Sequence, residues 1–173
     1  MTMRATPVAM LTELDLRAEL ARVHYESHAW AVRCCHGDAA DGEDVLHRTY
    51  MKVLGGEARF SGKSAFKTWL FGVIRQTARE QARQTWLRLL RLERWWRERE
   101  PDEEPDSEDE RIARLRHVLG KLSKRQQEVL HLVFYQNLTI QEAADVLDMP
   151  VGTARTHYER GKVRLRELLE ERR

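Results

Sequence analysis

Residues 138–162 read LTIQEAADVLDMPVGTARTHYERGK, and this stretch decides the fold of the C-terminal part of the chain. It opens with Thr139 and Glu142, whose spacing of three is that of a capping box at the start of a helix. Apolar residues at helical spacing follow. The Asp-Met-Pro sequence at 148–150 ends this helix, because proline cannot continue the hydrogen-bond ladder. A second helix is expected to open at residues 151–153, after a tight turn.

The second helix of this pair has one apolar stripe and one polar, basic face. Its inward positions recur at steps of four and three: Ala154, Tyr158, Gly161, Leu165 and Leu168. Its outward positions are Arg155, Thr156, His157, Arg160, Lys162 and Arg164. A major groove about 12 Å wide admits one helix, and Arg and Thr side chains can contact base edges there. The pattern predicts a helix-turn-helix that binds duplex DNA. The alternative is a solvated basic face on a structural helix pair.

Composition restricts the class of protein. The chain has 173 residues, enough for one ordinary domain or two small ones, with 34% charged residues and a net charge of +2. No apolar run approaches the roughly 18 residues that span a bilayer, and the N-terminus has no apolar core of signal-peptide length. We therefore expect a cytoplasmic protein without membrane insertion. Cys34 and Cys35 are the only cysteines, and adjacent cysteines rarely bridge, so no disulfide framework is expected.

The charge distribution predicts two domains. Residues 101–110 read PDEEPDSEDE, with seven acidic residues and no basic one, between Arg-rich flanks. Two prolines and this charge are typical of a linker. Helical periodicity dominates elsewhere, and alternating β-branched runs are scarce. The sequence thus predicts an all-α fold with two small helical domains, 1–98 and 111–173, joined by a flexible acidic linker at 99–110.

The N-terminal domain is expected to contain three helices. The first spans 14–34. A break at 37–42 precedes the second, at 43–54, which Gly55 and Gly56 end. A loop at 57–64 leads into the third, which begins near Ser64 and carries basic residues on its outer face: Lys63, Lys67, Arg75, Arg79 and Arg83. Residues 86–99 combine tryptophans and leucines with arginines. They are either a continued helix packed on its own domain or an exposed surface for a partner.

The C-terminal domain is expected to begin with two helices ahead of the helix-turn-helix. The first is amphipathic and has apolar residues from Ile112 to Leu122 at helical spacing. Ser123 and Gln126 form a capping box that opens the second, which continues through Phe134 and stops at Asn137.

Four sequence motifs resemble those of one family. They are DGEDVLHRTY at 41–50, FSGKSAFKTWLF at 60–71, LSKRQQEVL at 122–130 and PVGT at 150–153. In this order, with a linker between the second and third, they resemble the bacterial extracytoplasmic-function (group 4) sigma factors. The resemblance covers nearly the whole chain. It implies a protein that binds core RNA polymerase and directs transcription from specific promoters, usually under the control of an anti-sigma factor.

The resemblance also implies roles for individual residues. The minus-35 element would be read by Thr153, Arg155, Thr156, His157, Glu159 and Arg160. The minus-10 element would be melted and read by Phe60, Lys63, Ser64, Ala65, Phe66, Lys67, Trp69, Gln76 and Arg79. The polymerase clamp would be gripped by Asp41, Asp44, His47, Arg48 and Met51. The polymerase flap is the second expected contact on the enzyme. The acidic linker would follow the basic RNA channel of the polymerase.

Several positions depart from the family pattern and support other interpretations. The family usually has Gln-Glu where this chain has His47-Arg48, Asn where it has Gln76, and Asp or Asn where it has Glu80. One alternative is therefore a sigma-like decoy that binds a regulator without initiating transcription. Another is an ordinary helix-turn-helix regulator with a helical sensory domain.

A few residues are of the types that bind metal ions, but no catalytic set stands out. His24 and His28 are four residues apart, and Cys34, Cys35 and His36 follow, so the chain contains zinc-ligand types. No CxxC pair is present, however, and we expect no metal and no cofactor. No paired carboxylates, nucleophile–base set or phosphate-binding loop stand out, so we expect no catalytic residues and no enzyme.

Overall fold

The computed structural model describes residues 13–92 and 120–170, and the side chains of most of them. Every regular element in these two ranges is a helix, so the predicted all-α class is confirmed there. The chain divides between Gln84 and Thr85 into two compact units, which are described separately below. The predicted acidic linker at 99–110 and most of the helix predicted before residue 122 lie outside the described residues.

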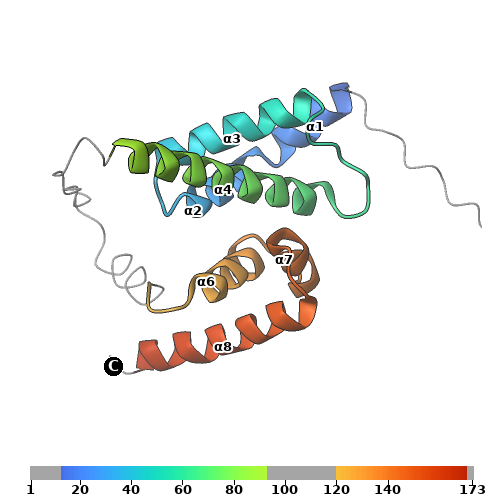
Figure 1. The fold of residues 1–173 in the computed structure, drawn as a ribbon. Helices are drawn as coiled ribbons and strands as arrows, with labels where there is room; N and C mark the ends of the chain where they lie inside the picture. The colour runs from blue at the N-terminus through green and yellow to red at the C-terminus, as the bar shows by residue number, and fades with distance from the viewer. Residues whose placement is uncertain (1–12, 93–119, 171–173) are drawn as a thin grey trace, which may run out of the picture. The chain divides into compact units, whose positions relative to one another are not determined.

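The first unit is built from three helices and the greater part of a fourth, which continues past Gln84 (Figure 1). They are α1 (Glu13–Arg22), α2 (His24–Cys34), α3 (Ala39–Leu54) and α4 (Phe66–Leu92). The single helix predicted for residues 14–34 is wrong in one respect: it is broken at Val23, where the backbone leaves the helical region at φ −104° and ψ 13°. Val23 is almost fully buried, so its side chain anchors the α1–α2 junction in the core.

Trp30 of α2 is central to the core of the first unit. Its side chain is completely buried, and its indole Nε1 donates a hydrogen bond to the carbonyl oxygen of Phe71 at 3.0 Å. The two rings are stacked, with centroids 5.9 Å apart. A buried indole N–H needs such an acceptor, because leaving it unpaired costs free energy. Trp30 therefore holds α4 against α2. The other buried apolar residues of this unit include Leu20, Val23, Val45, Leu46, Val53, Leu70 and Ile74.

The start of α3 differs from the sequence prediction. Residues 38–42 were expected to interrupt helical structure, but α3 already begins at Ala39. Asp38 is its N-cap, and the Asp38 carboxylate accepts from the backbone N–H of Asp41 at 2.9 Å. Gly42 lies inside the helix and is buried, and an added Cβ would meet Val32 Cγ2 at 2.6 Å. Gly42 is thus required by the close crossing of α2 and α3, and it does not break the helix.

The second unit contains α6 (Lys124–Leu130), the π-helical turn η1 (His131–Tyr135), α7 (Ile140–Leu147) and α8 (Val151–Glu170). Both predicted capping boxes are confirmed. At the start of α6, Ser123 and Gln126 exchange side-chain-to-backbone bonds. At the start of α7, Thr139 and Glu142 do the same at 3.2 and 2.8 Å. The π-helical turn was not predicted, since residues 131–135 were expected to continue an ordinary helix.

The α7–α8 pair has the predicted helix-turn-helix geometry. Three small residues, Ala143, Ala144 and Ala154, are 0–1% exposed, so the two helices can approach closely. Farther along α8, Gly161 is buried, and an added Cβ would lie 3.0 Å from Leu130 Cδ1 of α6. The predicted inward stripe of α8 therefore packs on both α7 and α6. This packing determines which side chains of α8 remain exposed.

Candidate nucleic-acid interface

The exposed face of α8 carries most of the side chains predicted to read DNA. Thr153, Arg155, Thr156, Glu159 and Arg160 are all exposed, and His157 is half-buried. Arg155 and Arg160 form no ion pair with the residues that the structure describes. Their guanidinium groups are therefore available for a base or phosphate. Guanidinium can donate two parallel hydrogen bonds to guanine or to a phosphate.

Two other side chains on α8 have partners within the helix. The Thr156 hydroxyl donates to the Gly152 carbonyl at 2.9 Å, which leaves its oxygen lone pairs and its methyl group for an external contact. Lys162 lies 3.6 Å from Glu159 and 4.8 Å above the ring of Tyr158. The Glu159 carboxylate is thereby partly balanced, which reduces its repulsion of a phosphate backbone.

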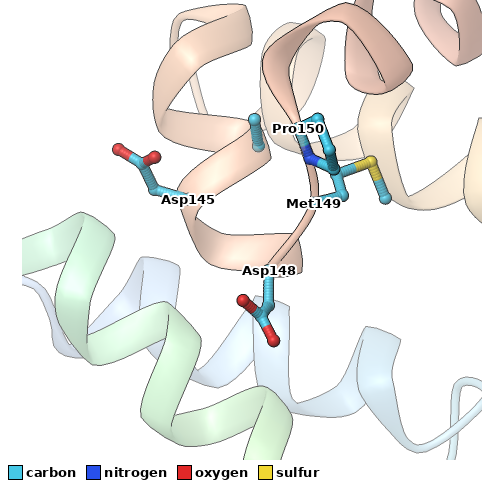
Figure 2. Close-up of a pocket in the computed structure, with 5 residues that line it drawn as sticks. Asp145, Asp148, Met149 and Pro150 are labelled. Atoms are coloured by element: carbon cyan, nitrogen blue, oxygen red, sulfur yellow. The ribbon is translucent and has the colours of Figure 1, made fainter.

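The turn between α7 and α8 forms an open hollow of about 400 Å³ lined by Ala144, Asp145, Asp148, Met149 and Pro150 (Figure 2). Asp148 adopts a left-handed conformation, with φ at 51°, and ends α7. Figure 2 shows the Asp145 and Asp148 carboxylates directed outward from the turn. Two carboxylates repel phosphate, so the turn itself is an unsuitable DNA surface. The basic face of α8 is therefore the surface on which a DNA contact is expected.

The loop before α4 brings three aromatic side chains together. Phe60, Phe66 and Trp69 form a triangle with centroid separations of 5.3 to 5.4 Å. Phe66 is buried, whereas Phe60 and Trp69 are half-buried and keep part of their ring surface accessible. Gly62, with φ at 71°, turns the loop beside them. Aromatic faces of this kind can stack on an unpaired base.

The remaining residues predicted for the minus-10 element are less uniform. Lys63 and Ala65 are exposed and Ser64 is half-buried, and on α4 both Gln76 and Arg79 are exposed. Lys67 is only one-fifth exposed. Its ammonium group lies 3.2 Å from Glu26 of α2 and 5.5 Å from the centroid of Phe71.

One expectation for α4 is wrong. Arg75 was predicted on the outer basic face, but it is 4% exposed and lies inside the unit. Its position one turn after Phe71, on the same side of α4, turns it toward the core.

Gln76 belongs to a polar network that links α4 to α3. Its Nε2 donates to Glu80 Oε1 at 3.1 Å. The other carboxylate oxygen, Oε2, accepts from Lys52 Nζ of α3 at 2.5 Å, and Lys52 Nζ also lies 3.4 Å from Thr77 Oγ1. The hydrogen bond from Lys52 is the largest of the influences that lower the pKa of Glu80, and the bond from Gln76 acts in the same direction. Sequence reasoning missed Lys52 as a member of the site, and it noted Glu80 only as a departure from the family pattern. The i, i+4 spacing of Gln76 and Glu80 was the available signal.

A third surface lies on α3. The residues predicted to grip the polymerase, Asp41, Asp44, His47, Arg48 and Met51, are all exposed. Their spacing of three and four places most of them on one face, opposite buried Val45, Leu46, Thr49 and Val53. Met51 is 60% exposed, which is unusual for a large apolar side chain. Asp41 is at the edge of this face and accepts from Gln81 of α4 at 3.3 Å. The face combines both charges with one exposed apolar group, as protein-binding surfaces do.

Comparison with known proteins identifies the two units. Residues 21–88 match the family described as Sigma-70 region 2, and residues 112–165 match Sigma-70, region 4. The chain belongs to the sigma-70 family of RNA polymerase sigma factors, in its extracytoplasmic-function group. The ECF RNA polymerase sigma factor SigX of Bacillus subtilis is 29% identical over 141 residues, covering 77% of this chain and 73% of SigX. The RNA polymerase sigma factor HrpL of Pseudomonas syringae is 26% identical over 144 residues, covering 77% of this chain and 76% of HrpL.

A solved sigma factor structure has the same fold. The sigma factor RpoE of Bartonella quintana, in complex with the anti-sigma factor NepR, aligns with a TM-score of 0.70 and 24% identity. The alignment covers 92% of this chain and 99% of RpoE. The all-helical architecture found here is therefore that of a sigma factor.

The histidines and cysteines considered as zinc ligands have neighbours of other kinds. His24 Nδ1 is 3.1 Å from the Tyr50 hydroxyl, and His28 Nε2 is 3.9 Å from Glu43. Cys34 and Cys35 are half-buried and are not joined in a disulfide, and burial is the main cause that raises the pKa of Cys35 to about 11. Within 13–92 and 120–170, no cluster of three such side chains could hold a metal ion. No helix in these ranges is long and apolar enough to cross a membrane.

The tryptophan-rich end of α4 is described only in part. The helix continues to Leu92, and Trp86 is 58% exposed. At Trp86, this exposure argues against the interpretation in which residues 86–99 pack on their own domain. Trp95 and Trp96 lie outside the described residues.

Proposed function

We propose that this chain is a sigma subunit that binds core RNA polymerase, contacts both promoter elements and directs promoter-specific initiation of transcription. One observation carries the proposal. A region 2 match precedes a region 4 match, and each lies on a unit that exposes most of the residues expected to make its contacts. An ordinary helix-turn-helix regulator would account for the second match only.

The proposed contacts divide between the two units. Thr153, Arg155, Thr156 and Arg160 of α8 read the minus-35 element, with His157 and Glu159 at the edge of the contact. The aromatic triangle of Phe60, Phe66 and Trp69 holds a base taken out of the minus-10 stack. A flipped base needs compensating contacts, and aromatic faces supply them for any base. Lys63 and Arg79 supply positive charge to the phosphates of the opened strand.

The exposed face of α3 is the proposed grip on the polymerase clamp, through Asp44, His47, Arg48 and Met51, with Asp41 at its edge. The second unit is proposed to bind the polymerase flap. Arg48 stands where relatives usually have an acidic residue, so we propose that the clamp of the cognate polymerase offers it an acidic or neutral partner. We further propose that the protein acts in the cytoplasm and carries no catalytic activity of its own.

An anti-sigma protein is the proposed regulator. The support comes from the structural relative RpoE, which was solved in complex with the anti-sigma factor NepR. Such a partner would cover surfaces that otherwise contact polymerase or DNA. Exposed Trp86 makes the stretch at 86–96 a candidate part of its binding surface. Replacing Trp95 and Trp96 with Ala is expected to weaken anti-sigma binding, as measured by titration of the purified pair, and unchanged affinity would argue against this surface.

The proposal is tested by run-off transcription with core polymerase on a promoter library randomised at both elements. We expect transcripts that depend on the added chain and share two sequence motifs at a fixed spacing. A decoy that only sequesters a regulator would give none. If the chain binds the library DNA but gives no transcripts and does not bind core polymerase, the helix-turn-helix regulator is the better description.

A further inference from the structure

The amide of Gln76 is held in one orientation by its neighbour. Gln76 is exposed on α4, and its Nε2 lies 3.1 Å from Glu80 Oε1. A carboxylate can only accept hydrogen bonds, whereas an amide has one accepting end and one donating end. The donating NH₂ group must therefore face Glu80. A half-turn of the amide would place its carbonyl oxygen against a carboxylate oxygen, and two acceptors repel each other.

Glu80 is itself held by a cation from another helix. Its second oxygen accepts from Lys52 Nζ of α3, and Lys52 is additionally within 3.4 Å of the Thr77 hydroxyl. The side chain of Lys52 is 28% exposed, and that of Glu80 is 44% exposed. The same contacts lower the pKa of Glu80, so it is ionised at neutral pH and keeps its acceptor-only character. The Lys52–Glu80–Gln76 chain thus connects a half-buried ammonium group on α3 to an exposed amide on α4.

The bond to Glu80 therefore determines which atoms of the Gln76 amide face solvent. With one N–H bonded to Glu80, Gln76 presents its carbonyl oxygen and its second N–H to solvent. The carbonyl oxygen can accept from the exocyclic amino group of adenine or cytosine. In the same register, the second N–H of Gln76 can donate to the ring nitrogen beside that amino group, which gives two hydrogen bonds. Thymine and guanine present keto oxygens, O4 and O6, in place of the amino group, so two acceptors would then face each other and at most the N–H contact would remain.

We infer that Glu80, anchored by Lys52, is a positioning residue that gives this sigma factor a preference for an amino base, adenine or cytosine, over a keto base at one nucleotide of the minus-10 element. The inference rests on the proposed function, because it takes Gln76 to face promoter DNA. Glu80 itself need not touch DNA. It acts by preventing the Gln76 amide from turning over, which would otherwise let the side chain satisfy either class of base.

The test uses holoenzyme assembled from core polymerase and the full chain, on promoters randomised across the minus-10 element. The measured quantity is the ratio of transcripts from amino bases to those from keto bases at each position. We expect one position in the wild type with a preference of about five- to a hundredfold, the range for one well-oriented amide contact. In Glu80→Gln, the new amide can accept or donate, so the preference at that position should fall by about threefold or more.

Non-additivity separates positioning from a general structural effect. Gln76→Ala should lose the same preference, and Glu80→Gln should cause no further loss in the Gln76→Ala background. Lys52→Met, which releases the carboxylate from α3, should lose part of it. Glu19→Gln is the matched control, because Glu19 pairs with Arg22 within α1 and belongs to none of the proposed contacts. Far-UV circular dichroism and a melting curve check that each variant is folded, and Lys52→Met carries the test if Glu80→Gln is not.

Three results would overturn the inference. The first is a wild type without an amino-over-keto preference at any position. The second is a Glu80→Gln ratio within about twofold of the wild type, or, where that variant does not fold, the same result for Lys52→Met. The third is an equal effect of Glu80→Gln with and without Gln76. Each of these requires transcripts from the wild type. A wild type that gives no transcripts from any promoter overturns the proposed function instead, and the inference falls with it.

Discussion

The two helices proposed to read the promoter, α4 and α8, present their polar side chains in different ways. On α8, Arg155 and Arg160 are exposed and form no ion pair with the described residues. On α4, Lys67 is paired with Glu26 of α2, and Gln76 is tied through Glu80 to Lys52 of α3. Packing against α7 and α6 only orients the exposed side chains of α8. On α4, by contrast, polar side chains are themselves bonded to residues of other helices in the unit.

Because of this difference, the two helices should tolerate substitutions to different degrees. A major groove is rigid and regular, so α8 can meet it with independent side chains on a well-packed support. An opened strand has no fixed shape, so the residues that hold it must themselves be held. Substitutions on α8 should therefore change DNA binding with little effect on stability. Substitutions among the residues that support α4 should change both DNA binding and stability.

The largest effect is expected on stability, from a substitution that removes the packing of α2 against α4. Trp30→Ala removes a completely buried indole and its hydrogen bond to Phe71, and should cost about 3–5 kcal/mol of stability in the first unit. Urea unfolding of the full chain, followed by circular dichroism, measures this loss. Trp86→Ala is the control, since Trp86 is 58% exposed, and should change stability by less than about 0.5 kcal/mol. Equal losses in the two variants would contradict the described core.

The next effect is on binding alone. Arg155→Ala and Arg160→Ala should each weaken binding to the minus-35 element by about 1–3 kcal/mol, because a guanidinium contact to a base edge or phosphate is lost. Their melting temperatures should match the wild type, because neither side chain packs in the core. Arg164→Ala is the control, as Arg164 lies farther along α8 and pairs with Glu167 at 3.1 Å. Titration of promoter DNA with the holoenzyme measures affinity. A clear drop in melting temperature for Arg155→Ala would contradict the comparison of the two helices.

Two glycines in the first unit should respond to the same substitution with opposite sign. Gly42→Ala places a methyl group 2.6 Å from Val32 Cγ2, so we expect a loss of about 1–3 kcal/mol from overpacking between α2 and α3. Gly72→Ala in α4 meets nothing within 4 Å and should gain about 0.5–1 kcal/mol, because alanine has less freedom to lose in a helix. Thermal denaturation of the two variants side by side decides the matter. A stabilised Gly42→Ala would show that the helix crossing is looser than described.

The smallest effect concerns pH. The pKa of Glu80 is lowered, first by its hydrogen bond from Lys52, so ionised Glu80 stabilises the folded state. For a lowered pKa, this contribution is present above the usual carboxyl range and is lost as the pH falls through the folded-state value. Because Glu80 is partly exposed, it should amount to less than about 1 kcal/mol. The stability gap between wild type and Glu80→Gln should therefore shrink when urea unfolding is repeated from pH 7 down to pH 3. A stability difference that does not change with pH would show that Glu80 does not act through its charge.

Much of the second unit could be predicted because its signals are local. The pairs Ser123 with Gln126 and Thr139 with Glu142 are three residues apart, so a capping box is visible in the sequence and is found as expected. The inward stripe of α8 follows from helical periodicity in the same way. The π-helical turn at His131–Tyr135 was not predictable, because its residues fit an ordinary helix equally well.

In the first unit, by contrast, the helical class, the aromatic loop and the exposed stripe of α3 could be predicted from the residues and motifs. The position of Gly42 inside a helix crossing, the burial of Arg75 and the pairing of Lys67 with Glu26 depend on how the helices pack. The same packing joins Glu80 to both Gln76 and Lys52. The physical reason is distance along the chain. Caps and stripes are made by residues within one or two turns of each other, whereas Lys67 and Glu26 are 41 residues apart and Lys52 and Glu80 are 28 apart. Periodicity says which face of a helix turns inward, but only packing says which side chain on another helix it meets.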